Sequence, residues 1–294
     1  MSHHHEHDHS HETHDHDADG SGLAELLDLD AEVLAGPLNA VRDDIASLLD
    51  APLRSILDLG AGTGTGTFGL LEHFPEAHAL AIDGSSDMLE RLRQRAEQRG
   101  LSERVTTLQA DLDEGVPGVD AVDLAWASAS LHHLADPDRT LTQVVGAIRP
   151  GGLLAVVELT DFTRFLDDGT PGGDAEANAH ALMASDRAAD LPAMGSDWGS
   201  RLTRAGFVIE LDRAIAVDLA PPLADVVGAY AFASLTRIRG ALGDRLEAAD
   251  REQLDRLLDG GSSDVRHRDD LHVRTDRQLR IARRPAAAPT STAR

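Results

Sequence analysis

A short apolar run passes directly into a loop with glycine at every second position, in the segment 56-ILDLGAGTGTG-66. Glycine has no Cβ, so such a loop can turn sharply and lets a bound nucleotide approach the main chain closely. The residues after the loop have a helical pattern, and Asp83 ends the next apolar run. A carboxylate at that place can accept hydrogen bonds from ribose hydroxyls. The segment therefore predicts a strand–loop–helix unit that binds a nucleotide.

Short apolar runs alternate with helical periodicity through the first half of the chain. The expected strands there are 54–60, 78–83, 104–111, 122–127 and 151–159. Helices such as 87–98 and 136–148 lie between them. This alternation predicts right-handed βαβ units and an α/β fold, whose mostly parallel sheet has helices on both faces. Two later runs, 207–219 and 271–284, are expected to extend the sheet, the last of them antiparallel.

Helical segments outside this alternation are expected to form lids over the sheet. Residues 21–50 have helical spacing interrupted by Gly36-Pro37, which predicts two helices. The main domain is expected to span 51–284, with insertions at about 160–196 and 223–259. The second insertion has a helical pattern, whereas the first is rich in Gly, Asp, Pro and Ala.

The composition narrows the chemistry that the chain can perform. Cysteine is absent and all 27 basic residues are arginine, which excludes disulfides, thiol nucleophiles and lysine Schiff bases. A formal net charge of −24 disfavours nucleic acid as a partner. No run approaches the roughly 20 apolar residues of a membrane helix, so no membrane partner is expected and the cytoplasm is the expected location.

The first 20 residues hold eight of the 15 histidines together with six acids. They show no apolar periodicity, so this segment is expected to be disordered, as is the tail 285–294. Because neutral imidazole is a good ligand for Ni²⁺, Zn²⁺ or Cu²⁺, one interpretation is weak binding of a divalent metal. The other is a solvated tail without a role, and no catalytic metal is expected in either case.

Four separated segments resemble motifs of the class I S-adenosylmethionine-dependent methyltransferases. They are ILDLGAGTGTGT (56–67), AIDGSSDML (81–89), LQADLDE (108–114) and IRPGGLLAVVE (148–158). They occur in the family's order, and the whole chain also looks like a group of bacterial methyltransferase-like proteins of undefined substrate. The resemblance implies a Rossmann-like sheet of seven strands with an antiparallel last strand, and S-adenosylmethionine as the cofactor.

The resemblance also implies a cofactor role for twelve residues. Those expected to line the methionine part are Asp58, Gly60, Ala61, Gly62 and Gly64. Asp83 would bind both ribose hydroxyls, in contacts strengthened by its charge. Those expected around the ribose and adenine are Gly84, Met88, Asp111 and Leu112, with Asp111 accepting from the adenine amino group. Ala127 and Ser128 would face the sulfonium. Asp58 and Asp111 could each instead cap a turn.

Two adjacent histidines, His132 and His133, follow the fourth expected strand. Sulfonium methyl transfer is an in-line displacement by an already activated cofactor, so a base is needed only for a nucleophile whose proton has a high pKa. Either histidine is a candidate for that base. Alternatively, one packs against the cofactor and the other orients the following helix, while Trp126 is expected mainly in the core. Three lid segments and the acidic composition favour a small-molecule methyl acceptor.

Other hypotheses remain open at this point. Gly64, Gly66 and Gly69 fit the dinucleotide pattern G-x-G-x-x-G, which would indicate an NAD(P)-dependent oxidoreductase. That pattern begins five residues beyond the strand end at Leu59, whereas the dinucleotide motif starts at the strand end. The glycines could also only make a tight turn. A third hypothesis is a non-catalytic protein that binds a cofactor or a metal.

Overall fold

The computed structural model describes residues 13–191 and 193–286. Its strands are β1 (Ser55–Leu59), β2 (His78–Asp83), β3 (Val105–Gln109), β4 (Val122–Ser128), β5 (Ile148–Leu159), β6 (Val208–Leu219) and β7 (Val273–Arg283). Its α-helices are α1 (Thr13–Val33), α2 (Ala35–Leu48), α3 (Thr65–His73), α4 (Ser86–Gln98), α5 (Pro137–Ala147), α6 (Pro171–Asp190), α7 (Trp198–Ala205), α8 (Val226–Leu242) and α9 (Ala248–Leu258). No helix among these residues is both long and apolar enough to cross a membrane.

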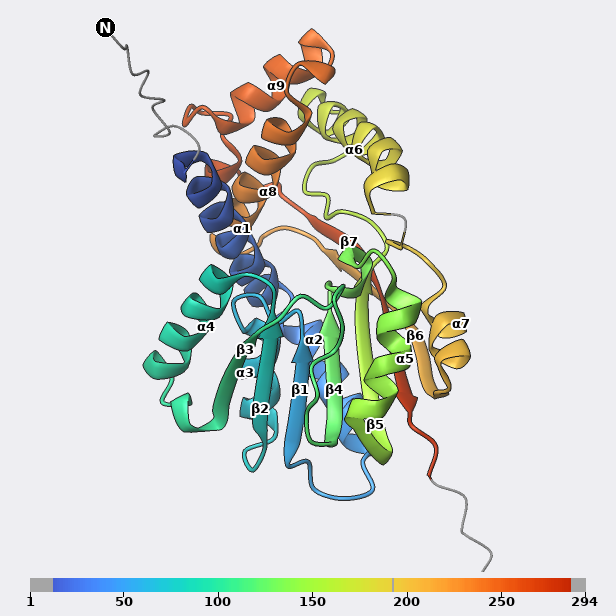
Figure 1. The fold of residues 1–294 in the computed structure, drawn as a ribbon. Coiled ribbons are helices and arrows are strands. Elements are labelled where there is room, and N and C mark those ends of the chain that lie inside the picture. The colour runs from blue at the N-terminus through green and yellow to red at the C-terminus, as the bar shows by residue number, and fades with distance from the viewer. Residues whose placement is uncertain (1–12, 192, 287–294) are drawn as a thin grey trace, which may run out of the picture.

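The strands described form one seven-stranded sheet in the order β3-β2-β1-β4-β5-β7-β6. Strands β1 to β5 pair in parallel, and β7 is antiparallel to both of its neighbours, β5 and β6. This confirms the predicted α/β class, the seven strands and the antiparallel last strand. Figure 1 shows helices on both faces of the sheet, and α1, α6, α8 and α9 gathered beyond one end of it.

The sheet separates two apolar clusters because successive side chains of a strand point to opposite faces. In the middle of the sheet, Trp126 and Ala155 belong to the cluster that α2, α3 and α8 cover. Their neighbours Ala127 and Val156 belong to the cluster that α5 and α7 cover. The central strands β1, β4 and β5 are buried on both faces over most of their length, as expected for a parallel sheet between two helical layers. This alternation also decides which residues can line a site on each face.

The N-terminal helices differ from the expectation in two places. Helix α1 begins at Thr13, so the prediction of disorder is wrong for residues 13–20, while residues 1–12 and 287–294 lie outside the described part. The break between the helices falls at Leu34, and Gly36-Pro37 lies in the first turn of α2. Proline is tolerated there because the first N–H groups of a helix have no intrahelical partner. The metal binding predicted for the histidine-rich segment falls largely on residues outside the described part.

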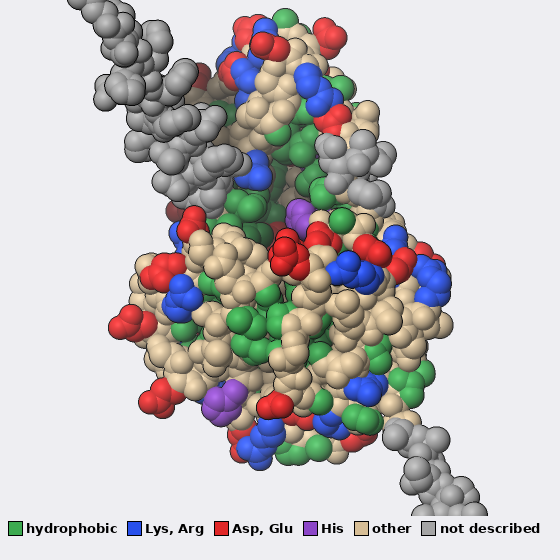
Figure 2. Space-filling view, in the orientation of Figure 1, with side chains coloured by type: hydrophobic (Ala, Val, Ile, Leu, Met, Phe, Trp, Pro, Cys, Tyr) green, Lys and Arg blue, Asp and Glu red, His purple; other side chains and the backbone are tan. Residues whose placement is uncertain are grey.

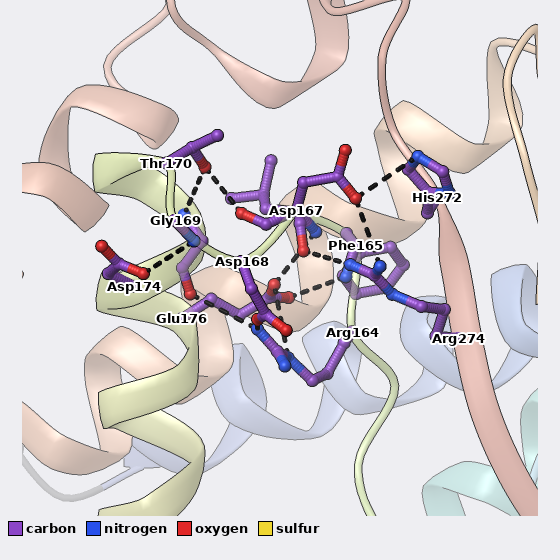
Figure 3. A network of polar contacts seen from close by, with 12 residues as sticks. Arg164, Phe165, Asp167, Asp168, Gly169, Thr170, Asp174, Glu176, His272 and Arg274 are labelled. Atoms are coloured by element: carbon purple, nitrogen blue, oxygen red, sulfur yellow. Dashed lines mark hydrogen bonds and ion pairs between the residues drawn. The ribbon is translucent and has the colours of Figure 1, made fainter.

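The insertion at 160–196 is more regular than its composition suggests, because it contains the long helix α6. The buried carboxylate of Glu176 on α6 accepts hydrogen bonds from the backbone N–H groups of Phe165 and Leu166, at 2.9 and 3.0 Å. Figure 3 shows Arg164 pairing with Asp168 beside this carboxylate. The polar network therefore fixes the chain before α6 against the helix itself.

Candidate functional site

A cavity of about 510 Å³ lies at the carboxyl ends of β1, β2 and β4. Ligands of open α/β sheets bind at this edge, and the volume suits a small ligand or cofactor. The wall combines the glycine loop, the ends of β2 and β4 and the turn after β3 with residues of α1, α2 and β7. Figure 2 shows one face of the molecule hollowed between the helices beyond the sheet and the sheet domain, with hydrophobic side chains inside the hollow.

Ten of the twelve residues predicted to contact a cofactor line this cavity. They are Asp58, Gly60, Ala61, Gly62, Asp83, Gly84, Met88, Asp111, Leu112 and Ser128. They come from four separate segments, which the parallel strands bring to one edge because their carboxyl ends point the same way. The arrangement therefore brings three of the four sequence motifs, 56–67, 81–89 and 108–114, together with the end of β4 into one site.

Ala127 and Gly64 do not line the cavity. Ala127 is fully buried in the cluster on the opposite face, so the prediction that it faces the ligand is wrong. The alternation of β4 instead directs Trp126 and Ser128 to the cavity. Gly64 has φ +82° and caps α3, and a Cβ there would lie 2.6 Å from Leu92 Cγ. Its role in the structure is a tight turn and close packing.

The other two glycines of the dinucleotide pattern also make room for side chains of this protein. A Cβ on Gly66 would lie 2.6 Å from Trp126 Nε1, and one on Gly69 would lie 1.9 Å from Arg42 Nη2. Both separations are shorter than non-bonded contacts allow. Packing therefore accounts for these glycines without a pyrophosphate.

The glycine loop is held against the ends of two strands. Asp83 Oδ2 accepts a hydrogen bond from the Gly62 N–H at 2.8 Å, and Oδ1 accepts one from the Ser85 N–H at 2.9 Å. Ser130 Oγ donates to the Leu59 carbonyl at 2.7 Å. A carboxylate has about four lone-pair sites, so Asp83 retains acceptor capacity for a ligand while it fixes the loop.

Asp58 is buried beneath the loop and accepts a hydrogen bond from Thr67 Oγ1 at 2.5 Å. Burial raises the pKa of Asp58 to about 7, the Thr67 hydrogen bond opposes this rise, and the charge of Asp83 adds to it. Near neutral pH this carboxyl can therefore exist in either protonation state. A cationic ligand in the cavity would favour the ionised form.

Asp111 caps a turn and also lines the cavity. Its Oδ1 accepts a hydrogen bond from the Asp113 N–H at 2.8 Å, so it caps the turn after β3. The same residue lines the cavity beside Leu112. The turn therefore presents a carboxylate to the cavity in a fixed orientation.

The two histidines have different environments. His132 is buried, and its Nδ1 lies 2.5 Å from Glu158 Oε2. His133 is exposed and lines the cavity, whereas His132 does not. Their ring centroids are 4.1 Å apart. Desolvation, and secondarily the proximity of His132, lower the pKa of His133. The structure therefore gives His133 access to a ligand and gives His132 a position behind it.

Glu158 also organises the backbone between β4 and the histidines. Its Oε1 accepts hydrogen bonds from the N–H groups of Ser130 and Leu131, at 3.1 and 2.8 Å. Ala129, immediately before them, lines the cavity and has φ +51°, a left-handed conformation that is rare for a residue with a Cβ. The Glu158 carboxylate thus holds a strained segment of the cavity wall in place.

Several residues of the wall were missed by the sequence analysis. Trp126 was expected mainly in the core, and it both packs there and lines the cavity. Arg42 and Arg277 belong to no motif, and both are buried. The sequence does contain a signal for Arg277. It lies two residues from both Thr275 and Leu279 along β7, so it points to the same face as these buried residues. Arginine at an inward-facing strand position indicates a buried partner or a site.

Helix α1 is fastened over the cavity by two acids. Asp28 accepts hydrogen bonds from Thr63 Oγ1 at 2.6 Å and from Arg91 Nη2 at 2.7 Å, and it also pairs with Arg95. Two residues further along α1, Asp30 accepts hydrogen bonds from Arg277 Nη2 at 2.5 Å and from the Tyr230 hydroxyl at 2.6 Å. These contacts join α1 to the glycine loop, α4, α8 and β7.

Comparisons with known proteins place this geometry among methyltransferases. A family model described as a methyltransferase domain matches residues 57–154. The trans-aconitate 2-methyltransferase of Deinococcus radiodurans is 30% identical over 227 residues, which cover 68% of this chain and 83% of that protein. The trans-aconitate 2-methyltransferase of Azoarcus sp. strain BH72 is 35% identical over 117 residues, which cover 40% of this chain and 44% of that protein. The match therefore spans less than half of the Azoarcus protein.

A solved structure shares the fold. A candidate methyltransferase from Bacillus halodurans C-125 superposes with a TM-score of 0.53 at 17% identity, over 83% of this chain and 100% of that chain. At this level of identity, the likeness concerns the arrangement of helices and strands alone.

Proposed function

Because the chain belongs to the class I S-adenosylmethionine-dependent methyltransferases, we propose that it transfers a methyl group from this cofactor to a small molecule. The observation that carries the proposal is the cavity at the carboxyl ends of β1, β2 and β4, where three of the four motif segments, 56–67, 81–89 and 108–114, meet the end of β4. Its acids suit a cofactor with a positive sulfonium and ammonium group. The volume of about 510 Å³ suits a cofactor of this size.

The residues of the cavity divide between the parts of the cofactor. Asp83 would accept hydrogen bonds from the ribose hydroxyls, and Asp111 from the adenine amino group. The glycine loop and Asp58 would lie along the methionine part. Met88 and Leu112 would contribute apolar contact to the ribose and adenine. These roles are the ones that the resemblance to the family implies, and they are supported by the fact that all of these residues line one cavity.

The bound cofactor supplies an electrophilic methyl group, so the main task of the protein is to bring the acceptor into line and to exclude water. His133 is the imidazole that lines the cavity among the residues that the structure describes. Its lowered pKa keeps it neutral at pH 7, so it can accept a proton from the acceptor. His132, held by Glu158, would position it. Helix α1 would act as a lid over the same cavity.

The acceptor is proposed to be a small molecule rather than a nucleic acid, because the chain carries a net charge of −24. The cytoplasm remains the proposed location. The trans-aconitate 2-methyltransferases among the relatives make small organic acids a first panel of acceptors to test.

The proposal is tested by incubating the protein with methyl-labelled S-adenosylmethionine and a panel of small metabolites that includes di- and tricarboxylic acids. The expected result is transfer of label to at least one small molecule, and its loss in Asp83→Ala. Calorimetry with S-adenosylmethionine and NAD(H) is run in parallel. Binding of NAD(H) without binding of S-adenosylmethionine would overturn the proposal in favour of an oxidoreductase.

A further inference from the structure

The carboxylate of Asp30 lies in the cavity wall with one oxygen engaged by the protein and the other open. Its Oδ1 accepts hydrogen bonds from Arg277 Nη2 at 2.5 Å and from the Tyr230 hydroxyl at 2.6 Å. Its Oδ2 accepts none from the residues that the structure describes, and the side chain keeps 20% of its surface exposed. Because Asp30 lines the cavity, its Oδ2 can accept a hydrogen bond from a ligand there.

Three other parts of the chain fix the orientation of this carboxylate. Arg277 comes from β7 and is buried, and Tyr230 comes from α8, which packs against α1. Burial, and secondarily the charge of Asp30, raise the pKa of Tyr230, so its hydroxyl keeps its proton and donates it to Asp30. The hydroxyl of Thr163, 2.9 Å from the Tyr230 oxygen, then donates to Tyr230 in turn. All of these contacts converge on Oδ1, so Oδ2 is the oxygen left for a ligand.

The order of the strands places Asp30 beyond the residues assigned to the adenine and ribose. Asp111 follows β3 and Asp83 ends β2, at one edge of the sheet. His133 follows β4, further along the same sheet, and Arg277 lies on β7, beyond β4 and β5. Asp30, which pairs with Arg277, therefore lies on the side of the cavity that is away from adenine and ribose. The methyl acceptor has its place on that side.

The wall around Asp30 restricts the chemistry of this acceptor. Leu27 and Leu23 precede Asp30 by three and seven residues, so they share its helix face, and both line the cavity. They suit an apolar body. The charged residues of the described wall are two arginines and five acids, namely Arg42, Arg277, Asp30, Asp58, Asp83, Asp111 and Asp113. A carboxylate placed beside Asp30 would meet a like charge, whereas a hydroxyl or amine group would find an acceptor.

We propose that Asp30 Oδ2 binds the methyl acceptor through an O–H or N–H group, so that the acceptor is a molecule with an apolar body and a hydroxyl or amine group. This inference rests on the proposed function, since it takes the second substrate of methyl transfer as the ligand. Asp30 is then a residue that determines specificity, and Arg277 and Tyr230 are positioning residues that act through it. Acids that lack such a donor group should be the poorer acceptors.

The test compares three probes that share one skeleton: benzylamine, benzyl alcohol and benzoate. Each is titrated by NMR into protein saturated with S-adenosylhomocysteine, at pH 7. Benzylamine and benzyl alcohol are expected to bind at least tenfold more tightly than benzoate, the scale of a hydrogen bond to a charged group. The comparison between the amine and the alcohol then shows which of the two donors the site prefers.

Asp30→Asn gives the sharpest prediction. Arg277 and Tyr230 both donate to Oδ1, so the amide oxygen should take that place and the amide NH2 group should face the cavity. The ratio of benzylamine affinity to benzoate affinity is therefore expected to fall about 10- to 100-fold. Asp44→Asn is the matched control, because it makes the same change on α2 outside the cavity, where Asp44 pairs with Arg213 at 2.6 Å. It should keep the wild-type ratio.

A second variant leaves the charge of Asp30 in place. Tyr230→Phe removes one donor to Oδ1 and keeps the ring that packs edge-on against Phe165, and Tyr230 itself does not line the cavity. Asp30 is then held less firmly, so the benzylamine-to-benzoate ratio should fall about two- to fivefold. If Asp30 and Tyr230 only held α1 in place, all three affinities would change alike and the ratio would stay constant.

Each outcome decides a separate question. A wild type that binds S-adenosylhomocysteine but binds benzoate as tightly as the other probes, or binds none of the three, would overturn the inference. So would an unchanged ratio in Asp30→Asn. Circular dichroism and thermal unfolding show whether each variant folds, and if Asp30→Asn does not, the ratio in Tyr230→Phe decides in its place. If the wild type does not bind S-adenosylhomocysteine, the proposed function fails instead.

Discussion

His132 Nδ1 and Glu158 Oε2 lie 2.5 Å apart in a pair that is almost closed off from solvent. The same carboxylate accepts hydrogen bonds from two backbone N–H groups of the cavity wall. One buried side chain therefore links β5, the strained residue Ala129 and the histidine pair. Its removal should affect both stability and the shape of the cavity.

We expect Glu158→Gln to lower the free energy of unfolding by about 2 kcal/mol, because hydrogen bonds to a buried charged group contribute about 1.5–3 kcal/mol. Urea denaturation at pH 7 measures this loss. His133→Gln is the matched control, since His133 is exposed and should change stability by less than about 0.5 kcal/mol. Equal effects of the two substitutions would contradict the role given to Glu158.

The affinity for S-adenosylmethionine should rise as the pH increases from 5.5 to 7.5. The pKa of Asp58 is raised to about 7, so its carboxyl becomes negatively charged through this range and attracts the cationic cofactor. We expect a change of about tenfold, the order of one partly screened charge pair. Calorimetry across the range measures it, and Asp58→Asn should remove the contribution. An unchanged pH profile in Asp58→Asn would refute this assignment.

The raised pKa of Asp58 affects the free energy of unfolding in the opposite direction, because it makes the folded protein less stable as the pH rises. The unfolded chain ionises Asp58 near its ordinary pKa of about 4, whereas the folded protein keeps it protonated up to about 7. Stability from this group is therefore lost as the pH rises from about 4 to 7 and changes no further above that. Relative to the wild type, Asp58→Asn should be more stable at pH 8 than at pH 4.5. Urea denaturation at both values makes the comparison.

Asp83→Ala should weaken binding of S-adenosylmethionine about 10- to 100-fold, because it removes a charged acceptor and frees the loop at Gly62. Asp83→Asn keeps one acceptor oxygen and should show a smaller loss. Calorimetry gives both affinities. Asp87→Ala, an exposed acid in the first turn of α4, serves as the control and should bind normally. A normal affinity in Asp83→Ala would remove Asp83 from the site.

Asp28→Asn should speed release of the cofactor by about three- to tenfold, since partly exposed charge pairs contribute up to about 1 kcal/mol each. The reason is that Asp28 fastens α1 to the glycine loop and α4, while Leu23 and Leu27 of α1 line the cavity. Stopped-flow dissociation measures the rate, and added salt should speed release in the wild type more than in the variant. Asp43→Asn on α2 is the exposed control. A salt effect of equal size in both proteins would count against the ionic fastening.

The strands could be predicted because their signals are local. All seven expected segments contain a strand. Asp83 is the last residue of β2, and the glycine loop and Asp111 follow the ends of β1 and β3, as the motifs imply. The position of β7 between β5 and β6 could not be derived, since it depends on pairing between distant segments. Helix α6 was missed because its composition is typical of a loop, and packing against α9 stabilises it.

The site could be predicted as far as its motifs extend. Ala127 was assigned to the wrong face because β4 is apolar on both faces, so the phase of its alternation cannot be seen in the sequence. Arg42 and Arg277 were missed for a different reason. They are far from the motifs along the chain, and only the folded sheet and α2 bring them to the cavity.

The placement of β7 has a consequence for the order in which the protein can be completed during synthesis. Strand β6 joins the sheet through β7, and β7 carries Arg277, which holds α1 through Asp30. When the nascent chain has emerged from the ribosome only as far as α9, β6 therefore has no strand to pair with. Helix α1 then also lacks the ion pair between Asp30 and Arg277. Helix α1 and strand β7 close the cavity together, so a nascent chain is not expected to bind its cofactor fully until β7 has emerged.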